Sequence, residues 1–130
     1  MVIRDLQHAP DIAPDRWGVP GLEQRVMLHD ENLMVVWLRI PPGTEFPLHS
    51  HPHVQIGFQV SGRSELRGED GTVEIGPGTA YMFAPNEVHG SRAIGDEPVI
   101  QLDAFYPSRE DYVEQTQEAA AAPGEHVGGS

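Results

Sequence analysis

The sequence predicts one all-β domain, a small sandwich or barrel, followed by a single short helix. The chain has 130 residues, a length typical of one domain. Its 14 glycines and 12 prolines do not gather into a linker but separate short apolar runs. Turn residues that recur every eight to twelve positions between short apolar runs are typical of β-sandwiches and β-barrels.

Five apolar runs are predicted to be strands, because turn residues end each of them. They span residues 33–40, 54–60, 72–75, 79–83 and 99–105. The turn Gly68-Glu69-Asp70-Gly71 predicts a hairpin ahead of the third run. Three prolines before residue 21 indicate that residues 1–21 form an extended arm, so that the barrel is expected over residues 22–107.

One helix is predicted over residues 108–122. Ser108 is in position to cap its first turn, and Asp111 lies three residues further on, as in a capping box. Tyr112 and Val113 then begin the apolar side of the helix. Residues 123–130 have too few apolar side chains to build a core and are predicted to be a disordered tail.

The composition excludes several classes of site and partner. Cysteine is absent, which excludes disulfides, thiolate zinc sites, iron–sulfur clusters and a cysteine nucleophile. All basic residues are arginines, so no lysine is available for a Schiff base or a P-loop. The formal net charge of -12 repels phosphates and anionic lipids, so we expect neither nucleic acid nor a membrane as partner. We expect a cytoplasmic protein, because the sequence shows neither a membrane-spanning run nor the features of a signal peptide.

Clustered histidines are the candidate metal site. His49, His51 and His53 lie close together, and His89 follows much later in the chain. Side chains two residues apart on a strand share a face, so His49 and His51 are expected to point at one metal ion. Pro52 interrupts strand pairing, so the same argument does not extend to His53. We expect His53 beside the site or at its rim.

Two motifs around these histidines resemble those of the cupin superfamily. The first motif contains Gly43, His49, His51, Gln55 and Gly62, and the second runs over residues 78–89 and ends at His89. In the first motif, glutamine stands where many cupins have glutamate. The resemblance implies the cupin double-stranded β-helix, a small β-barrel with an open mouth. It also implies that His49, His51, Gln55 and His89 are the metal ligands.

Such a ligand set has a chemical consequence. Three neutral imidazoles and one neutral amide leave the charge of a divalent ion uncompensated, so the ion acts as a Lewis acid and favours an anionic substrate oxygen. These ligands suit zinc, nickel, iron and manganese alike. The predicted cofactor is therefore one divalent transition metal of unspecified identity.

A third segment with chemically active side chains spans residues 99–106. Its alternating pattern divides it into two faces. One face has Ile100, Leu102 and Ala104, and the other has Gln101, Asp103 and Phe105. We expect the first face in the core, whereas the second faces either solvent or the barrel lumen. Arg109 suits a carboxylate ligand through its planar guanidinium, or is a surface arginine beside Glu110 and Asp111.

These segments together resemble the KdgF-type pectin-degradation cupins. The resemblance covers residues 22–112 and rests on residues 49–58, 78–90 and 103–112. It implies an enzyme that opens the ring of 4,5-unsaturated uronates to linear 5-keto-4-deoxyuronate. Asp103 and Arg109 would be catalytic, and Phe105, Gln101 and Tyr81 would contact this small anionic sugar acid. A cation beside Asp103 is expected to lower its pKa, which favours the role of base.

Other functions fit the same residues. A metal-dependent dioxygenase would consume oxygen at such a site. A polyketide cyclase would need an apolar cavity, for which the candidate residues are Trp37, Phe58, Tyr81, Phe83 and Phe105. A non-enzymatic sugar-binding or sensor module would bind metal without turnover. Because cupins of this size resemble dimers, we expect a homodimer, in which Trp17 of the arm could pack against the partner.

Overall fold

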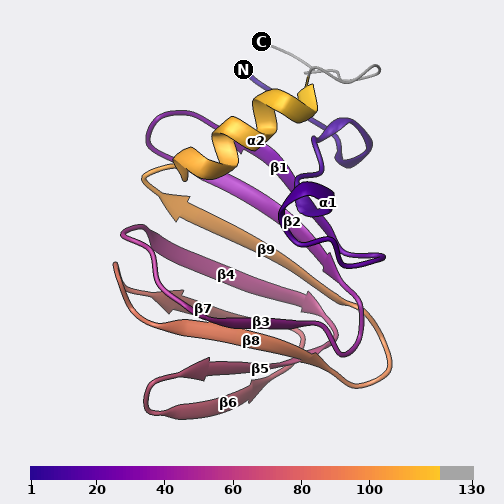
Figure 1. Cartoon of the computed structure of the whole chain (residues 1–130), viewed down its shortest axis with the longest axis vertical. Coiled ribbons are helices and arrows are strands. Elements are labelled where there is room, and N and C mark those ends of the chain that lie inside the picture. The colour runs from indigo at the N-terminus through magenta and orange to yellow at the C-terminus, as the bar shows by residue number, and fades with distance from the viewer. Residues whose placement is uncertain (121–130) are drawn as a thin grey trace.

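The computed structural model describes residues 1–120, which form two antiparallel β-sheets packed face to face (Figure 1). The strands are β1 (Glu23–His29), β2 (Met34–Ile40), β3 (Glu45–His49), β4 (Val54–Ser61), β5 (Arg63–Gly68), β6 (Gly71–Ile75), β7 (Thr79–Phe83), β8 (His89–Ile94) and β9 (Val99–Tyr106). The helices are the 3-10 helix η1 (Leu6–His8), α1 (Ala13–Arg16) and α2 (Glu110–Ala120). One sheet has the order β1-β2-β9-β4-β7 and the other β3-β8-β5-β6. The predicted all-β class with a C-terminal helix is confirmed.

The five predicted strands correspond to β2, β4, β6, β7 and β9, with ends within one residue of the predicted ones. The predicted hairpin joins β5 to β6 through the paired residues Gly68 and Gly71. The sequence pattern does not predict β1, β3, β5 and β8, because they carry charged residues or proline among few apolar ones. Their backbones are nevertheless paired with neighbouring strands that the rest of the fold brings alongside.

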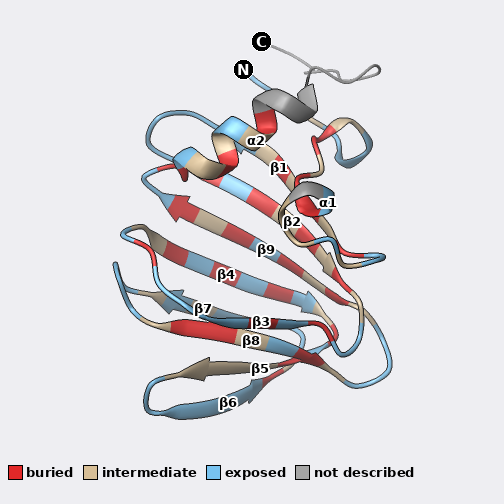
Figure 2. Cartoon of the chain, in the orientation of Figure 1, coloured by how far each residue is buried: buried red, intermediate tan, exposed pale blue. Residues whose placement is uncertain are grey.

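Burial alternates along the central strands of the five-stranded sheet, as the colours of β4 and β9 show (Figure 2). The inner face carries Gln55, Gly57, Gln59, Gln101, Asp103 and Phe105, all buried. The expectation that Ile100, Leu102 and Ala104 form the core is therefore wrong, and Leu102 is 39% exposed. The second sheet covers the inner face and leaves the more apolar outer face open. Of the two alternatives for Gln101, Asp103 and Phe105, solvent or the barrel lumen, the lumen is correct.

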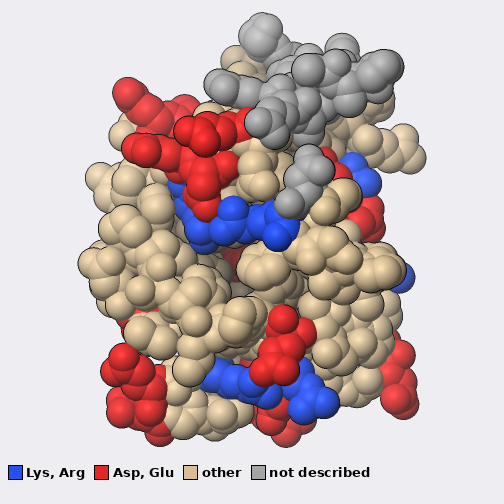
Figure 3. Space-filling model, viewed as in Figure 1, with Lys and Arg blue, Asp and Glu red and all other residues tan. Residues whose placement is uncertain are grey.

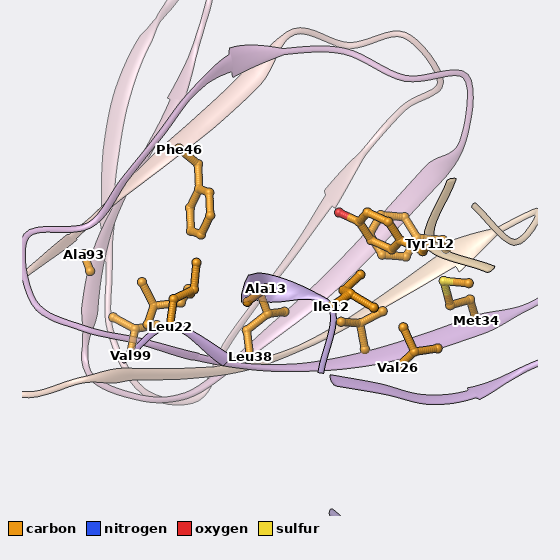
Figure 4. Packing of buried hydrophobic residues seen from close by; sticks show 13 residues of the cluster. Ile12, Ala13, Leu22, Val26, Met34, Leu38, Phe46, Ala93, Val99 and Tyr112 are labelled. Carbon is orange, nitrogen blue, oxygen red and sulfur yellow. The ribbon is translucent and has the colours of Figure 1, made fainter. Parts of the chain in front are cut away.

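The N-terminal segment is part of the packed structure and is not a simple extended arm. It contains η1 and α1, and Pro14 lies in the first turn of α1, where its missing N–H breaks no helix hydrogen bond. Ile12 and Ala13 are 2% and 1% exposed and belong to the apolar cluster at this end of the sheets (Figure 4). Trp17 packs edge-on against Phe46 of its own chain, with ring centroids 4.9 Å apart. Packing of Trp17 against a partner stays a prediction.

Helix α2 begins two residues later than predicted. The Ser108 hydroxyl donates to the backbone carbonyl oxygen of Asp30 and so ties the start of the helix to the β1–β2 connection. Asp111 pairs with Arg109 and Arg16 and does not complete a capping box with Ser108. Residues 121–122 of the predicted helix and the predicted tail lie outside the described residues. Within residues 1–120, no helix is both long and apolar enough to cross a membrane, and the cytoplasmic location stays a prediction.

Candidate metal centre and active site

Three of the predicted ligands converge between the two sheets. His49 ends β3 and His89 begins β8, and the two residues are direct partners in the strand ladder. His51 follows in the connection to β4, and one ring nitrogen from each histidine lies within 4.8 Å of the others. The prediction that His49 and His51 share a strand face is wrong, because β3 ends at His49. The chain turn after β3 brings His51 to the same point.

Backbone carbonyl groups orient two of these imidazoles. His49 Nδ1 lies 2.9 Å from the carbonyl oxygen of Pro47, and His89 Nδ1 lies 2.8 Å from that of Glu87. A carbonyl oxygen only accepts, so each Nδ1 carries the hydrogen and each Nε2 keeps its lone pair. Nε2 of His89 and Nδ1 of His51 are buried without a hydrogen-bond partner among the described residues. Buried nitrogens of this kind fit a metal ion, which would satisfy them.

Burial also favours the neutral form of His51 and His89. It lowers the pKa of His51 to about 4, and the positive charge of Arg109 lowers it in the same direction. Burial likewise lowers the pKa of His89. The neutral imidazole is the form that binds a metal ion. His51 and His89 therefore fit the predicted divalent transition metal both in position and in protonation state, and His49 fits it in position.

Gln55 and His53 border this cluster. Gln55 lies on β4 and its amide oxygen accepts a hydrogen bond from His51 Nε2 at 3.0 Å. Its role as a fourth ligand stays a prediction, although the oxygen already faces the histidines. The ring of His53 lies 5.3 Å from that of His51, centroid to centroid. This places His53 beside the cluster, where the interrupted strand leads us to expect it.

A row of residues across the five-stranded sheet supplies further site residues. It joins Tyr81 of β7, Gly57 of β4 and Asp103 of β9 as strand partners. The hydroxyl of Tyr81 donates to Asp103 Oδ1 at 2.8 Å, and so reaches across β4. It can do so because Gly57 has no side chain. A Cβ there would lie 2.1 Å from a ring carbon of Tyr81.

Gly57 is thus a site residue that the sequence analysis does not single out. The available signal is a glycine inside an otherwise apolar strand, which often marks a close approach of another group. Trp17, Gln24 and Tyr112 also border the site without being predicted as site residues. Their contribution depends on the packing of the N-terminal segment and α2, which a local pattern does not reveal.

Gly57→Ala should displace Tyr81 from Asp103, because a new Cβ cannot share the space of the tyrosine ring. We expect a loss of about 1–3 kcal/mol in the free energy of unfolding, the usual range for an overpacked site. Chemical denaturation followed by circular dichroism measures it. The matched control is Gly68→Ala, where the new Cβ comes no closer than 3.7 Å to a neighbour. Equal stability of the two variants would contradict this account of Gly57.

Asp103 is 5% exposed, and burial raises its pKa to about 6. Hydrogen bonds from Tyr81, Gln101 and Gln55 act in the opposite direction, as does the charge of Arg109. Among the described protein groups, burial therefore outweighs the positive charge of Arg109, whereas the lowering of the pKa expected from a metal cation stays a prediction. A carboxyl group with a pKa near 6 can both accept and release a proton near neutral pH.

Arg109 is 7% exposed and is not a surface arginine. Asp111 accepts hydrogen bonds from its Nε and Nη2 at 3.2 and 3.0 Å, and Arg16 binds the same carboxylate at 3.0 Å. The guanidinium carbon lies 4.1 Å from the centre of the Tyr112 ring. Figure 3 shows arginine surface along the upper border of a hollow, with acidic surface beyond it. Asp111 occupies one edge of the Arg109 guanidinium and leaves Nη1 for a ligand.

The predicted site residues therefore meet in one place. The pocket between the sheets is lined by His49, Gln55, Tyr81, His89, Gln101, Asp103, Phe105 and Arg109, among others. His51 is not one of the lining residues, and its ring centroid lies 5.7 Å from that of Phe105. Of the aromatic residues considered for an apolar cavity, Tyr81, Phe83 and Phe105 line the pocket. Phe58 is 45% exposed on the outer face and therefore does not line the pocket.

The two facing sheets and the three-histidine cluster between them define a small β-sandwich protein with a candidate metal centre. Residues 36–105 match the family described as the cupin domain. The match covers more than half of the chain, so the chain belongs to the cupin family.

Comparison with individual proteins shows which kind of cupin the chain is similar to. The chain is 29% identical to the pectin degradation protein KdgF of Dickeya dadantii (strain 3937), over 72% of this chain and 84% of that protein. The structure of KdgF from Halomonas sp. superposes with a TM-score of 0.66 at 29% identity, over 72% of this chain and 86% of that one. The H2HPP isomerase of Bacillus subtilis is 37% identical over 56% of this chain, but only 34% of the isomerase is covered. The predicted resemblance to KdgF-type cupins is confirmed.

Proposed function

We propose that this protein opens the ring of a 4,5-unsaturated uronate monosaccharide to the linear 5-keto-4-deoxyuronate. The observation that carries the proposal is a buried carboxyl group, Asp103, with a pKa of about 6 in a pocket that a buried arginine and a histidine cluster also line. Similarity to a pectin degradation protein supports a uronate as substrate, because pectin is a polymer of uronic acids. The protein is then a metal-dependent isomerase or lyase of small sugar acids.

Arg109 and Phe105 account for binding of such a substrate. The free Nη1 of Arg109 donates to the C6 carboxylate, and Phe105 offers an apolar wall to one side of the sugar ring. Gln101 and Tyr81 hold Asp103 through hydrogen bonds and border the same pocket. Attraction by Arg109 is local, and it overcomes the repulsion of an anion by the net charge of -12.

Asp103 moves the proton. As a carboxylate it accepts the hydrogen of the anomeric hydroxyl, the C1 carbonyl forms, and the bond between C1 and the ring oxygen breaks. The electron pair goes to the ring oxygen and leaves an enolate at C5 and C4. The same carboxyl group returns the proton to C4, so that atoms and charge balance. When held by His49, His51, Gln55 and His89, a divalent metal supplies Lewis acidity toward the substrate oxygens.

The direct test is to mix the metal-loaded protein with an unsaturated galacturonate prepared by lyase digestion. We expect the ultraviolet absorbance of the C4–C5 double bond to disappear much faster than in buffer, with the linear ketone detected by NMR. Oxygen uptake in the same vessel would favour a dioxygenase. Metal binding without any acceleration over spontaneous opening would favour a binding module and contradict the proposal.

We also propose a homodimer, formed through the outer face of the five-stranded sheet. Apolar side chains on this face are between 36% and 68% exposed, namely Val35, Ile56, Phe58, Val60, Met82 and Leu102. The strand register makes them neighbours, since Phe58 pairs with Leu102 and Ile56 pairs with Met82. A second copy of the same face would cover this patch as two sheets pack in a sandwich.

Phe58→Asp should convert the dimer into a folded monomer, because a charge at the centre of the patch cannot be buried against a second copy. Light scattering after size-exclusion chromatography measures the mass. Val73→Asp is the matched control, since Val73 is 64% exposed on β6 of the other sheet and should leave the mass unaltered. A wild-type protein that is monomeric at high concentration would rule out this interface.

A further inference from the structure

A hydrogen-bond chain, partly buried at its first member and buried at the other two, leads from the N-terminal segment into the pocket. Its members are Trp17 after α1, Gln24 in β1 and Tyr112 in α2, and all of them line the pocket. Trp17 Nε1 donates to Gln24 Oε1 at 3.0 Å, and Gln24 Nε2 donates to the hydroxyl oxygen of Tyr112 at 3.0 Å. All three residues lie outside the region 36–105 that matches the cupin domain.

The direction of this chain follows from the chemistry of its first member. An indole N–H donates and cannot accept, so the Gln24 atom that faces Trp17 is the carbonyl oxygen. The amide nitrogen of Gln24 then faces Tyr112 and donates to it. The tyrosine oxygen is therefore an acceptor in this contact, and its own hydrogen is left over. No residue within the described part of the chain accepts that hydrogen.

The unused hydroxyl hydrogen lies where a ligand can take it. Gln24 and Tyr112 are each 4% exposed, so neither is freely solvated. Figure 4 shows the Tyr112 oxygen directed toward the side of Phe46, which also lines the pocket. Burial raises the pKa of Tyr112 above its usual value, so the hydroxyl keeps its hydrogen at neutral pH. A buried donor without an acceptor is unfavourable, and a ligand oxygen would relieve it.

We propose that Tyr112 donates this hydrogen to an oxygen of the bound sugar acid, and that Gln24 and Trp17 are positioning residues that hold Tyr112 as a donor. The identity of the ligand rests on the proposed function. The guanidinium of Arg109 lies against the Tyr112 ring, so a carboxylate bound by Arg109 is near the tyrosine. The N-terminal segment and α2 then take part in ligand recognition together with the cupin domain.

Two variants should remove the donor in different ways. Tyr112→Phe keeps the ring beside Arg109 but has no hydroxyl. Gln24→Glu keeps the shape of the side chain, but a carboxylate accepts from both neighbours and turns the tyrosine hydrogen away from the ligand. Both variants should therefore weaken binding equally, and the double variant should be no weaker than either one. A purely structural role of Gln24 would not produce this equality.

The experiment measures binding of saturated D-galacturonate, a probe that cannot react, to the metal-loaded full chain by calorimetry. We expect Kd to rise about tenfold in each single variant and in the double variant, the loss of one hydrogen bond to a charged ligand. With the unsaturated substrate, KM should rise while kcat stays within about threefold. Tyr106→Phe is the control, because Tyr106 is 58% exposed and should bind as the wild type does.

Separate readouts distinguish this inference from the proposed function. If galacturonate binding depends on Tyr112 but the wild type does not open the ring, the proposed function is contradicted and the inference about Tyr112 is still supported. Ring opening with a Kd that Tyr112→Phe does not alter would overturn the inference alone. Additive effects of the two variants, or a wild type that binds no galacturonate, would overturn it as well. If Gln24→Glu does not fold, Trp17→Phe replaces it, with a smaller rise in Kd expected because the amide is then free to turn.

Discussion

Asp103→Asn should lower the rate of ring opening by about a thousandfold, in the range that positioned acid–base groups contribute. Asparagine has the same shape and still accepts the hydrogen bond from Tyr81, but it cannot take up a proton. Binding of saturated galacturonate should therefore stay within about threefold of the wild type. Loss of the ultraviolet absorbance of the substrate measures the rate, and calorimetry measures the binding.

The pH dependence gives an independent check on the same residue. Burial raises the pKa of Asp103 to about 6, so the carboxylate that acts as base is lost as the pH falls below that value. In the wild type, kcat/KM should decline tenfold per pH unit below about pH 6 once the carboxyl group is protonated. This decline should be absent from the residual activity of Asp103→Asn.

A matched control separates this effect from a general loss of an acidic residue. Asp70 is exposed in the β5–β6 turn, so Asp70→Asn removes the same charge far from the pocket lining. It should leave both the rate and the pH profile unaltered. Unimpaired ring opening by Asp103→Asn would remove Asp103 from the mechanism.

His89→Phe should reduce the bound metal from about one ion per chain to a small fraction, and ring opening should fall with it. The ring of His89 stacks on Phe83 at 4.2 Å between centroids, so phenylalanine keeps this contact while it removes the nitrogen. Elemental analysis of the purified protein measures the metal. Added metal should raise the melting temperature of the wild type but not of the variant, because only the wild type binds it when folded.

His29→Phe is the control for metal content. His29 is exposed at the end of β1 and lies outside the cluster of His49, His51 and His89. Its replacement should leave the metal content and the rate as in the wild type. A His89→Phe protein that keeps a full complement of metal would show that the ion sits elsewhere.

The local sequence pattern predicts much of the fold, because turns and short strands are specified by residues that are neighbours in the chain. Thr79–Phe83 is predicted with its observed bounds, and β2, β4, β6 and β9 within one residue, because turn residues end each run. The histidine spacing likewise anticipates a cluster that the structure forms. The cluster is therefore predicted correctly, although the argument for it is not correct. His51 reaches the cluster from the connection after β3, and not from a shared strand face as predicted.

Burial of a given face could not be read from local pattern. Along β9, the apolar Leu102 faces outward while Asp103 faces inward, which reverses the usual preference of these residue types. Alternation alone gives two faces and does not say which one a second sheet covers. The same limit applies to Arg109, whose burial depends on Asp111, Arg16 and Tyr112 packing around it.

Residue types and their spacing, by themselves, determined the all-β class and the turns, because each depends on near neighbours in the chain, and they singled out the histidines that form the cluster. Tertiary structure alone decided that Asp103 lies in the lumen, that Gly57 makes room for Tyr81, and that Trp17 and Gln24 reach the pocket. These contacts join segments far apart in sequence. Burial and hydrogen-bond geometry exist only after the sheets, the N-terminal segment and α2 have packed together.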